Sequence, residues 1–169
     1  PTLTQYFNIS APNSSHFLSE FLSLASYGSL KNKGFGPGYP QMDALTLYMM
    51  IRYLKPKRYI EVGSGLSTCY CDLARQKNKA EGKALEITCI EPNPYDALYS
   101  IDSICIIKDS VQNVPPDLFL SLEKNDILFI DSSHIVKLDG DVPYLYLEIL
   151  PLIKKGVYIH IHDIPFPYN

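Results

Sequence analysis

The sequence predicts a three-layer α/β fold of the doubly wound, Rossmann-like kind, with a mainly parallel sheet between two layers of helices. The first observation is that short apolar runs alternate with helical segments along most of the chain. The second is that these runs are almost continuously apolar, which is typical of strands covered on both faces of a parallel sheet. A glycine-rich turn after the first run is the third.

The predicted elements alternate in a regular order. Strands are expected at Arg58–Val62, Glu86–Ile90, Ile104–Lys108, Asp126–Ile130 and Gly156–His162. Helical segments are expected at Gln41–Tyr53, Ser67–Arg75 extending towards Lys79, Pro94–Ser100, Pro116–Glu123 and Val142–Ile153. Because parallel strands end at one edge of a sheet, the residues that follow each strand should meet there.

Residues 1–40 are predicted to form an extension to a core domain of residues 41–169. A short helix is expected from about Ser15 to Ala25, because apolar residues recur there at helical spacing. The Gly/Pro-rich segment 34–40 cannot be regular structure. It is interpreted either as a linker or as a flap over a ligand, and the sequence does not separate the two.

Composition limits the classes of function. The 169 residues fit one domain, and the formal net charge of -3 argues against a general nucleic-acid binder. A nucleic-acid substrate reached through a local basic patch stays open. No stretch approaches the ~20 apolar residues of a membrane span. The four cysteines form no C-x-x-C pair, and a reduced, cytoplasmic setting is expected.

The glycine turn is the most informative local motif. Gly63 and Gly65 follow a predicted buried strand, and Ser67 and Thr68 can cap the next helix. This is the strand–turn–helix unit of nucleotide-binding α/β folds. Thr68 stands where a dinucleotide site has its third glycine, which counts against a NAD-dependent oxidoreductase. Glu61, just before the turn, suits a cationic ligand better than a pyrophosphate.

Acidic residues and histidines follow the other predicted strands. Glu91 can accept hydrogen bonds from ribose hydroxyls, and the alternative is a solvated loop carboxylate. Asp109 can bond an adenine amino group or serve as a turn residue. The candidate side chains at the predicted sheet edge are Glu61, Glu91, Asp109, Asp131, His134, His162 and Asp163.

The order Glu61-x-Gly63-x-Gly65, then Glu91, Asp109 and Asp131, resembles the class I S-adenosylmethionine-dependent methyltransferases. Within them, the chain is most similar to methyltransferase family 24. Segments 36–43, 131–134 and 162–164 carry that similarity, which covers roughly residues 34–168. It implies S-adenosylmethionine as the cofactor, S-adenosylhomocysteine as the product and a small-molecule methyl acceptor.

The resemblance also implies roles for single residues. Glu61 and the glycines would hold the methionine end of the cofactor, and Glu91 the ribose. Asp109 would lie at the adenine and Asp131 near the sulfonium. The candidate cofactor-binding residues are Glu61, Gly63, Ser64, Gly65, Ser67, Thr68, Glu91, Pro92, Asp109, Ser110, Asp131 and Ser132.

His134, His162 and Asp163 are the candidate catalytic residues, because an unperturbed imidazole titrates near pH ~6.5 and can act as a base. Loop packing is the alternative role for each histidine. A divalent metal held by Asp131, His162 and Asp163 is an alternative form of the mechanism. The Asp139-Gly140-Asp141 run lacks the other ligands of a calcium loop, and we expect a solvated turn there.

Folds of this class normally carry two further strands after the fifth, whereas this chain stops at Asn169. The C-terminal strands are therefore expected to be missing, which leaves a sheet edge to be covered. A homo-oligomer is one way of covering it. A non-catalytic interaction domain that keeps the fold is the third functional interpretation, beside the methyltransferase and the oxidoreductase.

Overall fold

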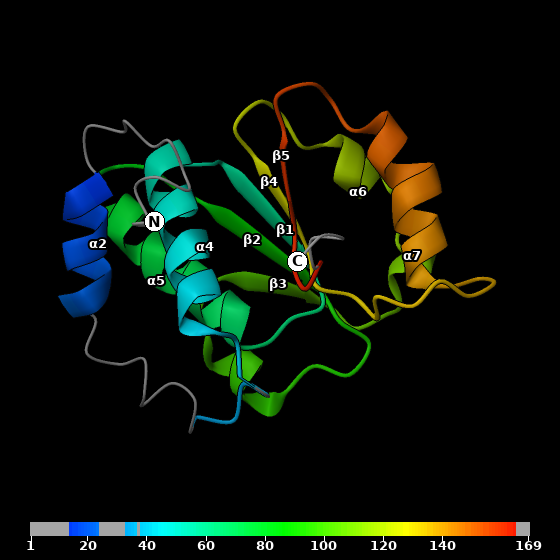
Figure 1. Cartoon of the computed structure of the whole chain (residues 1–169), viewed down its shortest axis with the longest axis horizontal. Helices are drawn as coiled ribbons and strands as arrows, with labels where there is room; N and C mark the ends of the chain where they lie inside the picture. The colour runs from blue at the N-terminus through cyan, green and yellow to red at the C-terminus, as the bar shows by residue number, and fades with distance from the viewer. Residues whose placement is uncertain (1–13, 24–32, 37, 165–169) are drawn as a thin grey trace, which may run out of the picture.

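A five-stranded, entirely parallel sheet forms the centre of the molecule (Figure 1). The computed structural model describes residues 14–23, 33–36 and 38–164. The strands run in the order β3-β2-β1-β4-β5. They are β1 (Arg58–Val62), β2 (Glu86–Ile90), β3 (Ile104–Ile107), β4 (Ile127–Ile130) and β5 (Tyr158–Ile161). The predicted fold class is confirmed, and β1 and β2 have the predicted bounds.

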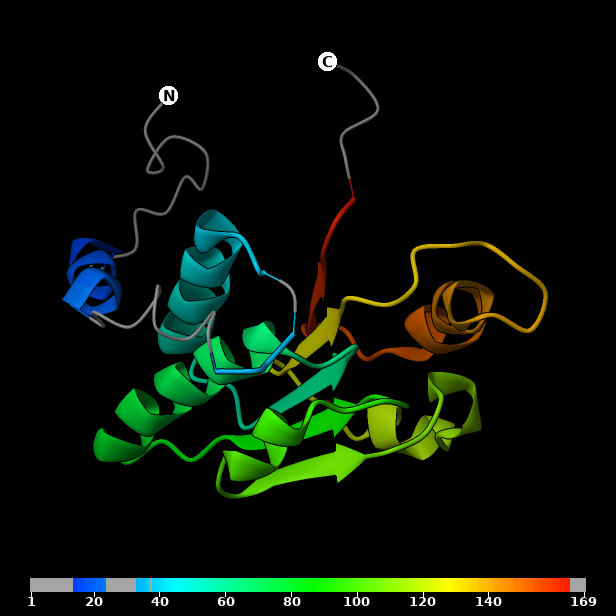
Figure 2. The same ribbon diagram turned by 90° about the horizontal axis from the view of Figure 1, so that it is seen from below.

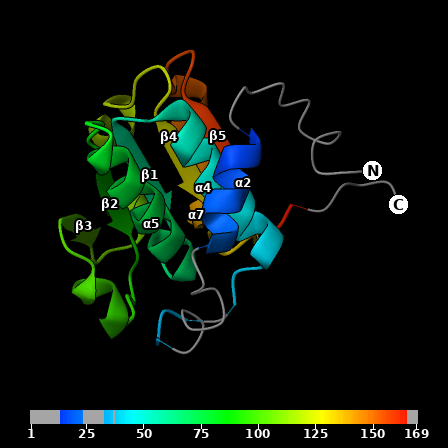
Figure 3. The ribbon, with the colours of Figure 1, turned by 90° about the vertical axis from the view of Figure 1, so that its left-hand side faces the viewer.

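Helices cover both faces of the sheet, as predicted. One layer holds α2 (Ser14–Ser23), α4 (Gln41–Leu54) and α5 (Leu66–Ala80), which lie together in Figures 1 and 3. The other holds α6 (Pro116–Leu120) and the helical segment that begins with α7 (Asp141–Pro143). Two short 3-10 helices, η1 (Asp96–Ser100) and η2 (Val111–Asn113), flank β3.

Two hydrophobic cores lie on the two sides of the sheet. Alternate side chains of a strand point to opposite faces. Tyr59 of β1 and Phe129 of β4 accordingly pack with α4 and α5. Their neighbours Ile60 and Leu128 pack on the other side, with Phe119 of α6. The continuous apolar runs of the sequence therefore serve both layers at once.

The described parts of residues 1–40 pack on the same core as the rest of the chain. Phe21, Phe35 and Tyr39 are buried in the cluster that includes α4 and α5. Arg52 of α4, which is 1% exposed, donates to Glu20 of α2 over 2.7 Å. A separate extension ending at residue 40 stays a prediction.

The segment predicted as one helix over Val142–Ile153 changes its hydrogen-bonding pattern twice. After α7 it continues as a π-helical stretch, η3 (Tyr144–Ile149), and then as a 3-10 helix, η4 (Leu150–Leu152). Pro151 has no N–H and cannot continue an α-helical pattern, which accounts for the change at the end. The resulting surface lies beside the loop that leaves β4 (Figure 2).

The strand register brings the carboxyl ends of the strands to one level. Val62 pairs with Ile90 on one side and with Ile130 on the other. The chain runs outwards from β1 in both directions, so β1 and β4 form the switch point at which open α/β sheets bind ligands. In the described part of the chain, no helix is long and apolar enough to cross a membrane.

Candidate functional site

The turn after β1 depends on glycine at its first position. Gly63 has a φ of +85°, and a Cβ there would lie 1.9 Å from the carbonyl oxygen of Asp131. A Cβ on Gly65 would lie 2.9 Å from the carbonyl oxygen of Phe35. The absence of a side chain therefore allows the end of β4 to lie against Gly63, and the segment before α4 to lie against Gly65.

Glu61 lies behind this turn rather than in the open. Its side chain is fully buried, and Ser67 Oγ donates to one carboxylate oxygen over 2.5 Å. The hydroxyl of Thr68 donates to the other oxygen. Burial raises the pKa of Glu61 to about 7, although the hydrogen bonds from Ser67 and Thr68 oppose that rise. Glu61 thus ties β1 to the first turn of α5.

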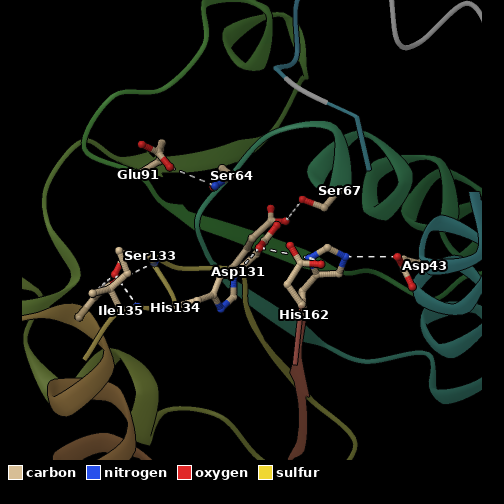
Figure 4. A network of polar contacts seen from close by, with 12 residues as sticks. Asp43, Ser64, Ser67, Glu91, Asp131, Ser133, His134, Ile135 and His162 are labelled. Carbon is tan, nitrogen blue, oxygen red and sulfur yellow. Dashed lines mark hydrogen bonds and ion pairs between the residues drawn. The ribbon is translucent and has the colours of Figure 1, made fainter. Parts of the chain in front are cut away.

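Glu91 is oriented by the backbone at the end of β2. The N–H of Ser64 donates to one of its carboxylate oxygens over 3.3 Å, and the N–H of Asn93 donates to the other over 2.9 Å. Figure 4 shows the Glu91 side chain reaching towards Ser64. The carboxylate therefore bridges the ends of two neighbouring strands, and each oxygen keeps a lone pair for a ligand hydroxyl.

A cleft of about 370 Å³ opens beside this bridge. Its lining consists of Val62, Gly63, Ile90, Glu91, Pro92, Ser110, Val111, Gln112, Asp131, Ser132, Ser133, Lys137 and Asp141. Of the predicted cofactor residues, it brings together Gly63, Glu91, Pro92, Ser110, Asp131 and Ser132. The polar residues missed by sequence reasoning are Gln112, Ser133, Lys137 and Asp141.

Other predicted residues lie around the cleft but outside its lining: Glu61, Ser64, Gly65, Ser67, Thr68 and Asp109. Asp109 is exposed, and one of its oxygens accepts from the N–H of Ser110 and from the amide of Asn113, each over 2.7 Å. Its observed contacts are those of a turn residue. A bond from Asp109 to adenine stays a prediction.

The turn expected at Asp139-Gly140-Asp141 is more than a solvated loop. Asp141 lines the cleft and accepts from both the backbone N–H and the hydroxyl of Ser133, each over 2.6 Å. Partial burial raises the pKa of Asp141, but these hydrogen bonds outweigh it and hold that pKa below its usual value. The pairing fixes the loop after β4 to the start of α7, which no short motif signals.

The ends of β4 and β5 form a cluster of side chains. Nδ1 of His162 lies 3.3 Å from Asp131 Oδ1 and 3.4 Å from Asp163 Oδ1. Nε2 of His134 lies 3.2 Å from the same oxygen of Asp131 (Figure 4). All three predicted catalytic residues therefore gather around Asp131. None of the three lines the 370 Å³ cleft, whereas Asp131 does.

Asp43 joins this cluster from a distant part of the sequence. Its carboxylate lies 3.3 Å from Nε2 of His162, across the ring from Asp131 (Figure 4). The ring of Tyr39 packs on the same imidazole with centroids 4.8 Å apart. Asp43 ends the segment 36–43 that carries the family resemblance, but the sequence assigns it no role, because an acid in the first turn of a helix is common without any function. The segment before α4 thus reaches the end of β5.

Three residues of the cluster are close enough to share a metal ion. Asp131, His162 and Asp163 each offer one ligand atom, and these atoms lie within 4.8 Å of one another. They are the residues that the sequence suggested for this role. Nitrogen and oxygen ligands of this kind suit several divalent ions, so the set does not select one.

Comparison with known proteins places the chain in a family. The family model of a methyltransferase domain, family 24, matches residues 60–164. The chain belongs to this family. The predicted resemblance is therefore confirmed.

One sequence match and one solved structure show how far the likeness extends. An uncharacterised protein of Archaeoglobus fulgidus is 33% identical over 102 residues, a match that covers 57% of this chain and 43% of that protein. The match thus spans less than half of the relative. The crystal structure of a Podospora anserina methyltransferase with S-adenosylhomocysteine bound superposes with a TM-score of 0.51 and 17% identity. The superposition covers 96% of this chain and 71% of the Podospora anserina chain, and this likeness supports the fold.

Proposed function

We propose that this chain binds S-adenosylmethionine in the 370 Å³ cleft and transfers its methyl group to a small-molecule acceptor. One observation carries the proposal. Gly63, Glu91 and Asp131 directly follow three different strands and border a single cleft at the switch point of the sheet. The chain that forms this cleft belongs to a methyltransferase family.

The chemistry of the lining fits this cofactor. A bare turn at Gly63 allows close approach of a ligand to the backbone. The Glu91 carboxylate, already held by two N–H groups, suits a pair of ribose hydroxyls. Asp131 places a negative charge where a sulfonium would be attracted. We assign Glu61 to holding the turn in shape through Ser67 and Thr68.

When bound, S-adenosylmethionine supplies a methyl group that is already activated on a positively charged sulfur. The protein's own tasks are then to position the acceptor and to remove its proton. His134 is the residue we propose for the proton, because its imidazole stands 3.2 Å from Asp131 at the edge of the cleft. Asp131 fixes the orientation of that ring, and His162 braces Asp131 from the other side.

Calorimetry tests the proposal directly. The chain should bind S-adenosylhomocysteine and should not bind NAD. Glu91→Ala removes the proposed ribose acceptor and should weaken S-adenosylhomocysteine by about 5- to 150-fold, which corresponds to roughly 1–3 kcal/mol. Glu86→Ala is the matched control, since Glu86 lies at the opposite end of the same strand and is 79% exposed.

Two outcomes would contradict the proposal. Binding of NAD without S-adenosylhomocysteine would favour the oxidoreductase interpretation. Binding of neither would favour a non-catalytic interaction domain that keeps the fold.

A metal-assisted form of the reaction is the second candidate. The close grouping of Asp131, His162 and Asp163 favours it. Those three residues would hold a divalent ion, which orients and acidifies an acceptor hydroxyl when bound. Titration with Mg²⁺ or Mn²⁺ should then show binding that Asp163→Asn weakens. Unchanged binding in that variant, or none in the parent, would leave His134 as the group that handles the proton.

A further inference from the structure

A second groove adjoins the cleft. Its volume is about 400 Å³, within the range of small-molecule sites. It runs between the loop after β4 and the helical segment that begins with α7, which lie side by side in Figure 2. The lining residues are Ser132, His134, Val136, Val142, Pro143, Tyr146, Leu147 and Ile164. All but the first two have apolar or aromatic side chains.

The groove and the cleft meet at shared residues. Ser132 lines both of them. His134 lines the groove, and its Nε2 lies 3.2 Å from Asp131, which lines the cleft (Figure 4). Ser132 and His134 therefore lie at the end of the groove that faces the cleft.

The walls of the groove carry large apolar side chains that are exposed to solvent. Val136 is 80% exposed, Leu147 is 75% exposed and Ile164 is 58% exposed. Covering such surface is favourable by about 25 cal/mol per Å². A polyol or an ion placed against these three side chains would lose hydration without gaining hydrogen bonds from them. An apolar body with a single polar end matches both parts of the groove.

We infer that this groove is the acceptor subsite, and that the acceptor is an aromatic alcohol whose ring packs on Val136 and Leu147 while its hydroxyl faces His134. The inference rests on the proposed function and adds the chemical class of the acceptor. His134 is then placed between the acceptor hydroxyl and Asp131. Val136, Leu147 and Ile164 select the apolar body of the acceptor, since their side chains offer it no hydrogen-bond partners.

A fluorescence titration with 2-naphthol in the presence of saturating S-adenosylhomocysteine tests the inference. The parent protein should bind 2-naphthol, and it should not bind the polyol myo-inositol. Val136→Asp and Leu147→Asp place a charge in the groove wall, and each should weaken 2-naphthol at least about tenfold. Both positions are exposed, so the fold should tolerate these changes.

Leu138→Asp is the matched control. Leu138 is 96% exposed on the same loop but does not line the groove, so this variant should bind 2-naphthol like the parent. All the variants should keep the parent's affinity for S-adenosylhomocysteine, which reports on the proposed function separately. Loss of S-adenosylhomocysteine binding in the parent would remove the proposed function itself, and with it the acceptor role.

Three results would overturn the inference while the cofactor proposal stands. The first is a parent that binds S-adenosylhomocysteine but not 2-naphthol. The second is unchanged 2-naphthol affinity in Val136→Asp and Leu147→Asp. The third is a stable dimer in sedimentation that becomes a monomer only in those two variants, because a second copy would then be what covers the groove.

Discussion

The two halves of the sheet edge are built in different ways. At β1 and β2, backbone groups hold the site: Gly63 leaves room for the Asp131 carbonyl, and two N–H groups hold Glu91. At β4 and β5, side chains hold one another, through contacts of 3.2–3.4 Å among Asp131, His134, His162 and Asp163. The backbone contacts at β1 and β2 therefore fix the geometry of the first half. At β4 and β5, by contrast, side chains can exchange hydrogen-bond partners without a movement of the backbone.

This difference matches the two proposed roles, cofactor binding at β1 and β2 and acceptor binding at β4 and β5. A cofactor that is the same in every cycle suits a rigid backbone cradle. A varied acceptor and a mobile proton suit side chains that share contacts. We therefore expect substitutions in the β1–β2 half to affect the fold most and those in the β4–β5 half to affect it least.

The largest effect should come from Gly63→Ala. The new Cβ would meet the Asp131 carbonyl at 1.9 Å, and the φ of +85° is unfavourable for alanine. The free energy of unfolding should fall by about 3–5 kcal/mol, measured by urea denaturation.

Gly82→Ala separates the two causes of that loss. Gly82 also has a positive φ, +76°, but nothing lies within 4 Å of its added Cβ. Its cost should be only about 1 kcal/mol. Equal losses in the two variants would show that the Asp131 carbonyl is not what demands glycine, and the rigid description of this half would be wrong.

The next largest effect depends on pH and concerns Glu61. Its pKa is about 7 in the folded protein against a reference value of 4.5, chiefly because of burial. Between these values the folded state binds a proton that the unfolded state does not, so this group's contribution to stability falls as pH rises. Glu61→Gln removes that dependence. Its stability relative to the parent should rise by about 2–3 kcal/mol between pH 4.5 and pH 8.

Ser67→Ala sharpens this test. Loss of its hydrogen bond should raise the pKa of Glu61 further and move the fall in stability to higher pH. Thermal or urea unfolding across the pH range measures both variants. A Glu61→Gln profile parallel to that of the parent would mean that folding does not raise the pKa of Glu61.

The smallest effect on stability should come from the ends of β4 and β5, at the contact between Asp43 and His162. Asp43 is 42% exposed, so solvent screens its attraction to the imidazole. A double-mutant cycle with Asp43→Asn and His162→Gln should give a coupling of about 0.5–1 kcal/mol in urea denaturation. A coupling above about 3 kcal/mol would mean that the side-chain contacts at β4 and β5 constrain the structure as strongly as the glycine turn does.

The sequence was sufficient for the sheet and for the backbone half of the site. The sequence predicts Glu86–Ile90 with the observed bounds, because Ile87, Cys89 and Ile90 form a mostly apolar run that ends before the acidic Glu91. Gly63 and Glu91 were found for the same reason, since a turn or an acid directly after a strand must reach the sheet edge. Local pattern and strand direction together determine these positions.

The remaining parts depend on contacts between distant segments. Asp43 meets His162 across 119 positions of sequence, and Asp141 meets Ser133 through a loop without a motif. The sequence predicts Glu61 at the ligand, whereas its carboxylate is buried under the turn with Ser67 and Thr68. Which way a strand residue points depends on the layer that covers it, and the sequence alone does not determine that.

A crystal structure of the chain with S-adenosylhomocysteine would show whether the cofactor occupies the 370 Å³ cleft. We expect ligand density in the cleft bordered by Gly63, Glu91 and Asp131, with the ribose against the Glu91 carboxylate. Density for the ligand elsewhere, with this cleft filled only by solvent, would contradict it.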